Sequence, residues 1–337
     1  MGALLLSALA ILAISTSAPA ATLPDDVQAI VKRGELRVGV KSDVPGFSMQ
    51  DLSGNYAGLE VDLAKKLAEA MGLKADDVVF TAVTAKTRGQ LLDTGDIDMV
   101  LATFTITEER KQIWNFSTSY YTDAVSLLVK KNSGISGYAD LTNKRIGVAE
   151  GSTSKDALIK AAKENGVTLT DTDNIQTFPD YPSIKAALDA GQVQAFCVDG
   201  SILSGYLDPS TEILSTVRFA PQEYGVATKL SNKGLASFVE EKITGWLSDG
   251  TNKYYMDPAS GRMTTGVSVI DGYYYYFNES GHRKTGWAIV DGVYYYFDPA
   301  ADGRMVAGTT MNIGGTNYQF AANGACTTNG GATNNVY

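Results

Sequence analysis

The residues of this chain that could do chemistry gather at the ends of short apolar runs. Before Gly250, polar side chains follow the expected strand ends at five places: Lys41, Arg88, Thr103 to Arg110, Ser152-Thr153 and Asp199. Ligands of open α/β sheets bind outside the carboxyl ends of the strands. We therefore expect these positions to contribute to one common site.

The segment from Asp98 to Arg110 has the residue types of a carboxylate-binding site. It begins with a short apolar run, which is typical of a buried strand, and hydroxyls follow at Thr103 and Thr105. Thr107 suits a helix N-cap, and Arg110 stands where a capping box would have Glu or Gln. Backbone amides at a helix start and a guanidinium would bind a carboxylate there. The structural alternative is an ordinary strand-to-helix turn with a surface arginine.

Length and charge restrict the possible classes of protein. The 337 residues suffice for two domains, and a net charge of −9 with one histidine argues against a nucleic-acid partner. The apolar run from Leu4 to Ile14, followed by Ala18-Pro19-Ala20, predicts a signal peptide over residues 1–21 and therefore export. We expect no metal site, cofactor or catalytic group, since the only histidine, His282, lies far from the polar positions above.

Apolar runs and amphipathic segments alternate from Thr22 to about Ser248, which indicates an α/β fold. Strands are expected over residues 36–40, 78–83, 99–102, 124–131, 145–149 and 193–198, and helices over 61–71, from about 90, after 154, over 184–190 and over 234–247. This α/β domain (22–250) would have one lobe at about 22–127 and 223–250 and a second at about 128–222. Crossings near Leu127 to Lys131 and Pro221 to Gly225 suggest a hinge.

Composition changes after Gly250. The last 88 residues hold 11 of the 18 tyrosines, and their basic and acidic residues nearly cancel, at five against six. Glycines recur 20, 22 and 21 residues apart at Gly261, Gly281, Gly303 and Gly324. Each unit is typical of a β-hairpin that is too small to bury its own aromatic face, so neighbours must stack. We predict such repeats over 251–324 and a loose tail over 325–337.

The segment from about Glu35 to Leu247 resembles the family 3 extracellular solute-binding proteins of amino-acid ABC importers. The residues that carry the likeness are Leu36-Arg37-Val38-Gly39-Val40, Gly58 to Ala64, Thr105 to Arg110, Asn115-Phe116-Ser117 with Tyr120-Tyr121, Gly147-Val148 with Gly151-Ser152-Thr153, and the strand that ends at Asp199. The resemblance implies a two-lobed, type II periplasmic-binding-protein-like α/β fold and a permease partner. Lys41 with Asp43-Val44-Pro45, Lys86 to Gly89 and Phe178 to Ser183 look most like the aspartate/glutamate-binding branch.

The resemblance also implies roles for the site residues. Arg110, Thr105 and the amides around Thr153 would hold the α-carboxylate, and Asp199 would accept from the α-ammonium. Lys41 and Arg88 would bind the side-chain carboxylate of aspartate or glutamate, and the same cleft would be completed by Thr103, Ser152 and Tyr181. Three cations would face Asp199 alone, which is costly without an anionic ligand. In the alternative, Lys41 and Arg88 are solvated rim charges and the ligand is neutral, such as glutamine.

The tyrosine-rich units resemble choline-binding or cell-wall-binding repeats of Gram-positive surface proteins. A cage for a quaternary ammonium would be formed by Tyr274, Tyr276, Trp287, Tyr294 and Tyr296. The earlier equivalent of Trp287 is Val267, so choline-substituted teichoic acid, glucan or another wall polymer are equal alternatives, as is a purely structural aromatic ladder.

The whole chain is thus expected to be an exported receptor that binds an acidic amino acid by lobe closure. It would deliver the ligand to an ABC importer while the repeats retain it at the cell wall. The alternatives are a receptor for polar neutral amino acids, a wall-attached adhesin, and an enzyme on the same fold, such as a wall hydrolase or a dehydratase.

Overall fold

The computed structural model describes residues 23–248, 253–257, 264–278 and 281–328. The expected signal peptide and residues 329–337 of the expected loose tail lie outside the described residues. Residues 325–328 are not loose, because their backbone groups bond to the last hairpins, for example Thr327 N to Gln319 O. Among the helices that are described, none is both long and apolar enough to cross a membrane.

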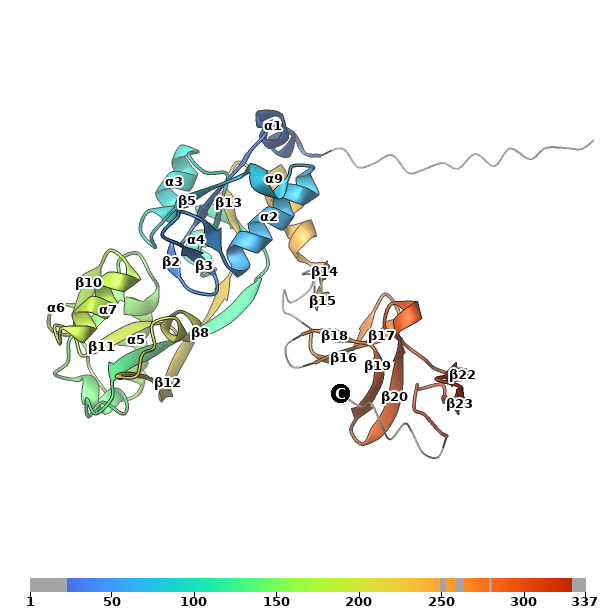
Figure 1. Cartoon of the computed structure of the whole chain (residues 1–337). Coiled ribbons are helices and arrows are strands. Elements are labelled where there is room, and N and C mark those ends of the chain that lie inside the picture. The colour runs from blue at the N-terminus through green and yellow to red at the C-terminus, as the bar shows by residue number, and fades with distance from the viewer. Residues whose placement is uncertain (1–22, 249–252, 258–263, 279–280, 329–337) are drawn as a thin grey trace, which may run out of the picture.

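The first lobe is built on a mixed sheet with the strand order β5-β1-β6-β13-β7 (Figure 1). Its strands are β1 (Leu36–Val40), β5 (Val78–Ala82), β6 (Met99–Leu101), β7 (Trp114–Phe116) and β13 (Ala227–Lys229). β1, β5 and β6 run parallel, so their carboxyl ends meet at one edge of the sheet. A small antiparallel sheet follows β1, with strands β2 (Asp43–Val44), β3 (Ser48–Gln50) and β4 (Tyr56–Ala57).

Helices pack on both faces of this sheet, and all but the shortest of them bury apolar side chains. They are α1 (Asp25–Arg33), α2 (Leu59–Met71), α3 (Arg88–Thr94), the short α4 (Glu108–Lys111) and α9 (Lys233–Ile243). The α2 helix ends as its sequence predicts, because Gly72 adopts φ 93° and its amide bonds back to the last turn. Apolar residues of α1, α2 and α9 form one buried core with β1 and β6.

The second lobe repeats the plan with the strand order β10-β9-β11-β8-β12. Its strands are β8 (Tyr121–Lys130), β9 (Ile146–Ala149), β10 (Ile175–Phe178), β11 (Ala195–Asp199) and β12 (Thr211–Tyr224), and its helices are α5 (Ser154–Glu164), α6 (Asp171–Asn174), α7 (Tyr181–Asp189) and α8 (Gly200–Ser204). β9, β10 and β11 are parallel, whereas β8 and β12 run antiparallel to their neighbours. The two-lobed α/β fold that the sequence predicts is therefore present.

β8 and β12 form the connection between the lobes (Figure 1). They pair from Thr211 opposite Lys130 to Tyr224 opposite Tyr121, and only residues 125–129 of β8 also pair with β11 of the second sheet. The first crossing therefore lies before Val125 and is not at the expected Leu127 to Lys131. The long apolar run of β8 does not mark the crossing, because most of its residues are buried inside the second lobe.

The C-terminal region consists of successive antiparallel hairpins, as predicted. Their strands are β14 (Gly245–Ser248) with β15 (Lys253–Met256); β16 (Gly266–Ile270), β17 (Tyr273–Phe277) and β18 (Arg283–Lys284); β19 (Gly286–Val290), β20 (Val293–Asp298) and β21 (Arg304–Met305); and β22 (Thr310–Ile313) with β23 (Thr316–Gln319). Two of the turns are Asp-Gly pairs, at Asp271 and Asp291, in which both residues have a positive φ. This is the backbone conformation that tight hairpins require.

One boundary differs from the prediction. The sequence predicts a helix from Gly234 to Leu247, but α9 ends at Ile243 and residues from Gly245 onward form β14. A glycine followed by an aromatic residue favours strand over helix, and pairing of β14 with β15 satisfies the backbone groups of this segment. The hairpins thus begin directly after the last helix of the first lobe.

Candidate ligand-binding site between the lobes

Arg110 lies at the strand-to-helix corner that the sequence singles out. Thr107 is the N-cap of α4, and its hydroxyl accepts a hydrogen bond from the Arg110 amide at 3.2 Å, as predicted. The Arg110 guanidinium donates to Thr105 O at 2.7 Å and, in the other lobe, to Gly151 O at 3.3 Å. It also lies 4.7 Å from the centre of the Phe104 ring. Burial lowers the pKa of Arg110 to about 9, so this charge is held partly away from water.

Thr105 and Thr153 are joined by Gln222, which the sequence analysis did not identify. Gln222 Oε1 accepts from Thr105 Oγ1 at 2.7 Å and from Thr153 Oγ1 at 2.8 Å. Thr105 belongs to the first lobe and Thr153 precedes α5 of the second, while Gln222 lies on β12. No sequence signal distinguishes this glutamine, since its partners are more than 60 residues away in the chain.

Thr103 and Ser152 make different contacts from those expected. Thr103 adopts φ 44°, which turns the chain sharply after β6. The Thr103 hydroxyl is buried and has no hydrogen-bond partner of normal geometry among the described residues. Ser152 Oγ donates to Ala149 O at 2.7 Å, so in this structure it closes the end of β9.

Arg88 begins α3 and is not a solvated rim charge. Its side chain is buried, and Nη1 donates to Ala102 O at 2.6 Å and to Thr103 O at 3.2 Å. The guanidinium lies 3.9 Å from the centre of the Phe104 ring. Burial lowers the pKa of Arg88, and Nε has no hydrogen-bond partner among the described residues. Arg88 therefore holds the turn after β6 and offers one unused donor.

Lys41 immediately follows β1 and is also buried. Only 1% of its surface is exposed, and Nζ lies 3.8 Å from Asp43 Oδ1 and 4.3 Å from the centre of the Tyr181 ring. Burial lowers the pKa of Lys41 to about 8, although the carboxylate of Asp43 raises it in part. The alternative of two solvated rim charges is thus wrong for Lys41 as well as for Arg88. A buried ammonium normally has a carboxylate or other anion close by.

Glu60 is a buried acid that the sequence analysis missed. It stands in the first turn of α2 and is fully buried, where it accepts from Thr103 N at 2.5 Å, Tyr120 Oη at 2.6 Å and Ser48 Oγ at 3.0 Å. Burial raises the pKa of Glu60, and these hydrogen bonds and the charge of Arg88 lower it in part. An acid in a first helical turn usually faces solvent, which is why its sequence position gave no signal.

The expected charge balance must therefore be corrected. Three cations were expected to face Asp199 alone, but Asp43 and Glu60 also interact with the buried cations. Three acids thus face Lys41, Arg88 and Arg110, and the excess of two positive charges is not present.

Asp199 is the last residue of β11 and is buried. The hydroxyl of Tyr224, which comes from the end of β12, donates to Asp199 Oδ2. Burial raises the pKa of Asp199 to about 7, against the opposing effects of the Tyr224 hydrogen bond and the two arginines. An ammonium group beside this carboxylate would replace the lost solvation and stabilise its charged form.

Tyr181 forms a wall between Lys41 and the apolar interior of the second lobe. It begins α7, is buried, and packs against the rings of Phe196 and Tyr206 at centroid distances of 6.1 and 6.4 Å. Its backbone amide donates to Asp43 Oδ2 at 3.3 Å, which links α7 to the first lobe.

The two lobes are in direct contact around these residues. Lys86 pairs with Glu150 at 2.8 Å, and Tyr206 Oη donates to Asp43 O at 2.5 Å. Gly151 lies so close to the loop before α3 that a Cβ there would come within 2.8 Å of Lys86 Cα. This arrangement is a closed one, and it encloses three polar atoms that make no hydrogen bond among the described residues: Asp43 Oδ1, Arg88 Nε and Thr103 Oγ1. Such atoms call for a polar partner.

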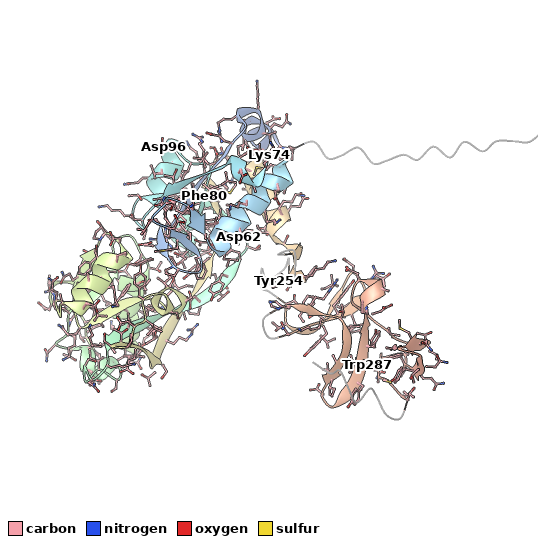
Figure 2. The ribbon with its side chains drawn as sticks, in the orientation of Figure 1. Asp62, Lys74, Phe80, Asp96, Tyr254 and Trp287 are labelled. Carbon is pink, nitrogen blue, oxygen red and sulfur yellow. The ribbon has the colours of Figure 1, made fainter. Side chains whose placement is uncertain are left out.

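The five residues of the expected choline cage do not form one cluster. Trp287 (Figure 2) is 9% exposed and contacts Tyr296, Tyr318 and Phe320, whereas Tyr276 stacks on Phe297 at 5.7 Å. Tyr274 is 48% exposed, and Tyr294 is half-buried on β20. Tyr276 and Trp287 nevertheless line one hollow.

Comparisons with known proteins establish the family. Residues 36–257 match bacterial extracellular solute-binding proteins, family 3, and residues 264–301 and 284–330 match choline-binding repeats. The glutamine-binding protein GlnH of an ABC transporter of Bacillus subtilis (strain 168) is 34% identical over 67% of this chain and 81% of its own length. The L-cystine-binding protein TcyJ of Escherichia coli (strain K12) is 32% identical over 66% of this chain and 81% of its own length.

Solved structures agree with this assignment. The arginine-bound form of truncated ArgBP from T. maritima has a TM-score of 0.58 and 27% identity, and the match covers 64% of this chain and 98% of that protein. These three proteins are named for three different ligands, so similarity at this level does not identify the ligand. The chain belongs to the family 3 bacterial extracellular solute-binding proteins and continues into a choline-binding repeat region.

Proposed function

We propose that this chain is an extracellular receptor that binds aspartate or glutamate between its lobes and delivers it to an ABC importer. The observation that carries the proposal is Lys41, a lysine that is 1% exposed and follows the first strand of the cleft. The remaining polar groups of the site supply the contacts that any α-amino acid needs.

The α-carboxylate and the α-ammonium would bind to different lobes. Arg110 contributes a guanidinium from the first lobe, and its neighbour Thr105 contributes a hydroxyl. Asp199 contributes a carboxylate from the second lobe. A ligand that bridges them stabilises the closed arrangement, because only that arrangement lets it satisfy both charges.

The side-chain carboxylate would bind near Lys41. The Lys41 ammonium lies beside Tyr181 and 3.8 Å from Asp43, which is longer than a good charge-assisted hydrogen bond. Arg88 Nε and Thr103 Oγ1 are further buried donors without described partners. A second carboxylate would give these donors an acceptor, at a gain of roughly 1.5–3 kcal/mol for each charge-assisted hydrogen bond.

Glutamine is the second candidate ligand. The relative from Bacillus subtilis is named for glutamine, and Asp43 already offsets part of the Lys41 charge. The side-chain amide of glutamine has an oxygen for Lys41 and an NH₂ group that could donate to Asp43 Oδ1, which accepts no hydrogen bond from the described residues. The choice between the ligands therefore depends on whether the net charge near Lys41 remains positive.

Titration calorimetry on the purified protein with aspartate, glutamate, glutamine, asparagine and histidine tests the proposal. We expect aspartate or glutamate to bind at least tenfold more tightly than its amide. Binding of glutamine as tight as that of glutamate would refute the acidic-ligand proposal and support the second candidate.

We further propose that the repeat region retains the exported receptor at the cell wall through a wall polymer. The match to choline-binding repeats supports this role, and choline-substituted teichoic acid and glucan are the candidate polymers. Cell fractionation of the full chain and of a variant that lacks residues 245–337 tests it. The truncated receptor should appear in the medium with its amino-acid binding intact.

A further inference from the structure

A hollow with a volume of about 280 Å³ lies between two successive repeat units, β16–β18 and β19–β21. Tyr276 comes from β17, Arg283 and Lys284 form β18, and Trp287 and Ala288 belong to β19, with Thr285 between the two units. Figure 2 shows Trp287 within this part of the molecule. The hollow is smaller than a typical pocket for a drug-sized ligand, and its size suits a single sugar ring.

Two basic residues distinguish the β16–β18 unit from the β19–β21 unit that follows it. Arg283 and Lys284 follow Gly281 by two and three positions, and the same positions after Gly303 hold Met305 and Val306. Strand pairing gives the same equivalence, since Arg283 lies opposite Phe277 and Met305 lies opposite the matching Phe297. The next unit therefore uses apolar side chains where this unit has two cations.

Of the two cations of the hollow, Arg283 has a carboxylate partner among the described residues and Lys284 has none. Arg283 pairs with Asp302 at 2.7 Å and donates to its backbone oxygen at 2.6 Å. Among the described residues, no carboxylate pairs with Lys284. A quaternary ammonium beside this lysine would meet like-charge repulsion worth about tenfold or more in affinity. An anionic group would instead form a charge-assisted contact with it.

The aromatic residues supply an apolar wall for the rest of the ligand. Tyr276 is half-buried and stacked on Phe297, and the Trp287 ring is fixed by the rings of Tyr296 and Tyr318. Aromatic rings held in place in this way offer a flat surface at little entropic cost. The hydrocarbon face of a sugar ring fits such a surface.

We propose that this hollow binds a sugar unit that carries an anionic group, a uronic acid or a sugar phosphate, and not a quaternary ammonium. The inference rests on the proposed wall-binding role only for the source of that sugar. The repeat region would then bind a wall polymer through a contact between Lys284 and an anionic group of that polymer.

Calorimetric titration of the full chain with D-glucuronate, glucose 6-phosphate, glucose and choline chloride tests the proposal. We expect at least one of the two anionic sugars to bind more tightly than glucose and than choline. The two anionic probes distinguish a carboxylate ligand from a phosphate ligand. Absence of binding by both anionic sugars, or tighter binding of choline, would overturn the proposal.

Lys284→Met gives this unit an apolar residue, as in its neighbour, and should weaken binding of the anionic sugar at least tenfold. The matched control is Lys66→Met, on the exposed surface of α2, which should change nothing. Equal affinities in wild type and Lys284→Met would also overturn the proposal. Because aspartate binding is measured on the same samples, failure at the hollow is distinguished from failure of the proposed receptor function.

Discussion

Thr105 and Thr153 come from different lobes, and their hydroxyls donate to the same oxygen of Gln222. This shared acceptor lies on β12, one of the two strands that connect the lobes. The contact can form only when the lobes are closed, so Gln222 couples the hinge strand to the closed arrangement.

Gln222→Met should weaken binding of every amino-acid ligand by a similar factor. It removes the shared acceptor and with it two hydrogen bonds, each worth about 0.5–1.5 kcal/mol, so we expect a roughly tenfold loss of affinity. Gln192→Met, at an exposed site in the second lobe, is the matched control. Calorimetry with glutamate and glutamine measures both, and an unchanged affinity would show that Gln222 has no part in closure.

Substitutions of Arg110 and Lys41 should have different effects, because Arg110 is needed to bind any amino acid and Lys41 to select the acidic side chain. Arg110→Ala should abolish measurable binding of all amino acids, because it removes the cation for the α-carboxylate. Lys41→Met should lower affinity for aspartate and glutamate at least tenfold, through loss of a charge-assisted hydrogen bond, and spare glutamine. Equal losses for glutamate and glutamine in Lys41→Met would contradict this division of roles.

Ligand affinity should fall as the pH decreases below about 7. Burial raises the pKa of Asp199 to about 7 in the free protein, above the usual range, so this carboxyl is protonated at lower pH. The neutral form does not attract the α-ammonium, so affinity should decrease by up to about tenfold between pH 8 and pH 6. The pKa of Lys41 is about 8, so its gain of charge over the same range offsets part of this loss for the acidic ligands. Calorimetry across this range checks it. In Asp199→Asn, binding should be weak throughout and this pH dependence should be lost.

The sequence predicted where the site residues lie better than it predicted which residues they contact. Strand ends and the Thr107 cap follow from local patterns, and for this reason Lys41, Arg110 and Asp199 lie where they were expected. Gln222 and Glu60 were missed because most of their contacts join segments that are 43 or more residues apart.

Local sequence patterns also left the burial of Lys41 and Arg88 open and placed the end of α9 wrongly. Lys41 and Arg88 could be read as surface cations, since the surroundings that bury them come from both lobes. The end of α9 was placed too late because the residues after it keep apolar character, and only their pairing with β15 makes them a strand.

Glu60→Ala should destabilise the first lobe far more than Glu60→Gln does. The carboxylate is fully buried and accepts three hydrogen bonds, so its removal leaves buried donors without an acceptor and takes away a negative charge that stabilises Arg88. We expect a loss of about 3 kcal/mol or more in the free energy of unfolding for Ala and about 1–2 kcal/mol for Gln, which retains an acceptor. Urea unfolding without ligand measures both.

A matched substitution at Glu69, an exposed acid of α2 that pairs with Lys66, provides the control. Glu69→Ala should cost less than about 1 kcal/mol, as exposed ion pairs do. Similar losses for Glu60→Ala and Glu69→Ala would mean that the contacts of Glu60 contribute nothing beyond those of a surface acid.

The residue at which the chain is truncated should decide whether the isolated receptor domain is monomeric. A chain that ends at Thr244 retains α9 complete and loses β14, whereas a chain that ends at Gly250 keeps β14 but removes its partner β15. An unpaired strand edge promotes association between chains. We therefore expect the shorter chain to be monomeric and the longer one to self-associate, with equal affinity for the amino acid in the monomers. Analytical ultracentrifugation compares the two, and a monomeric chain ending at Gly250 would argue that β14 needs no partner.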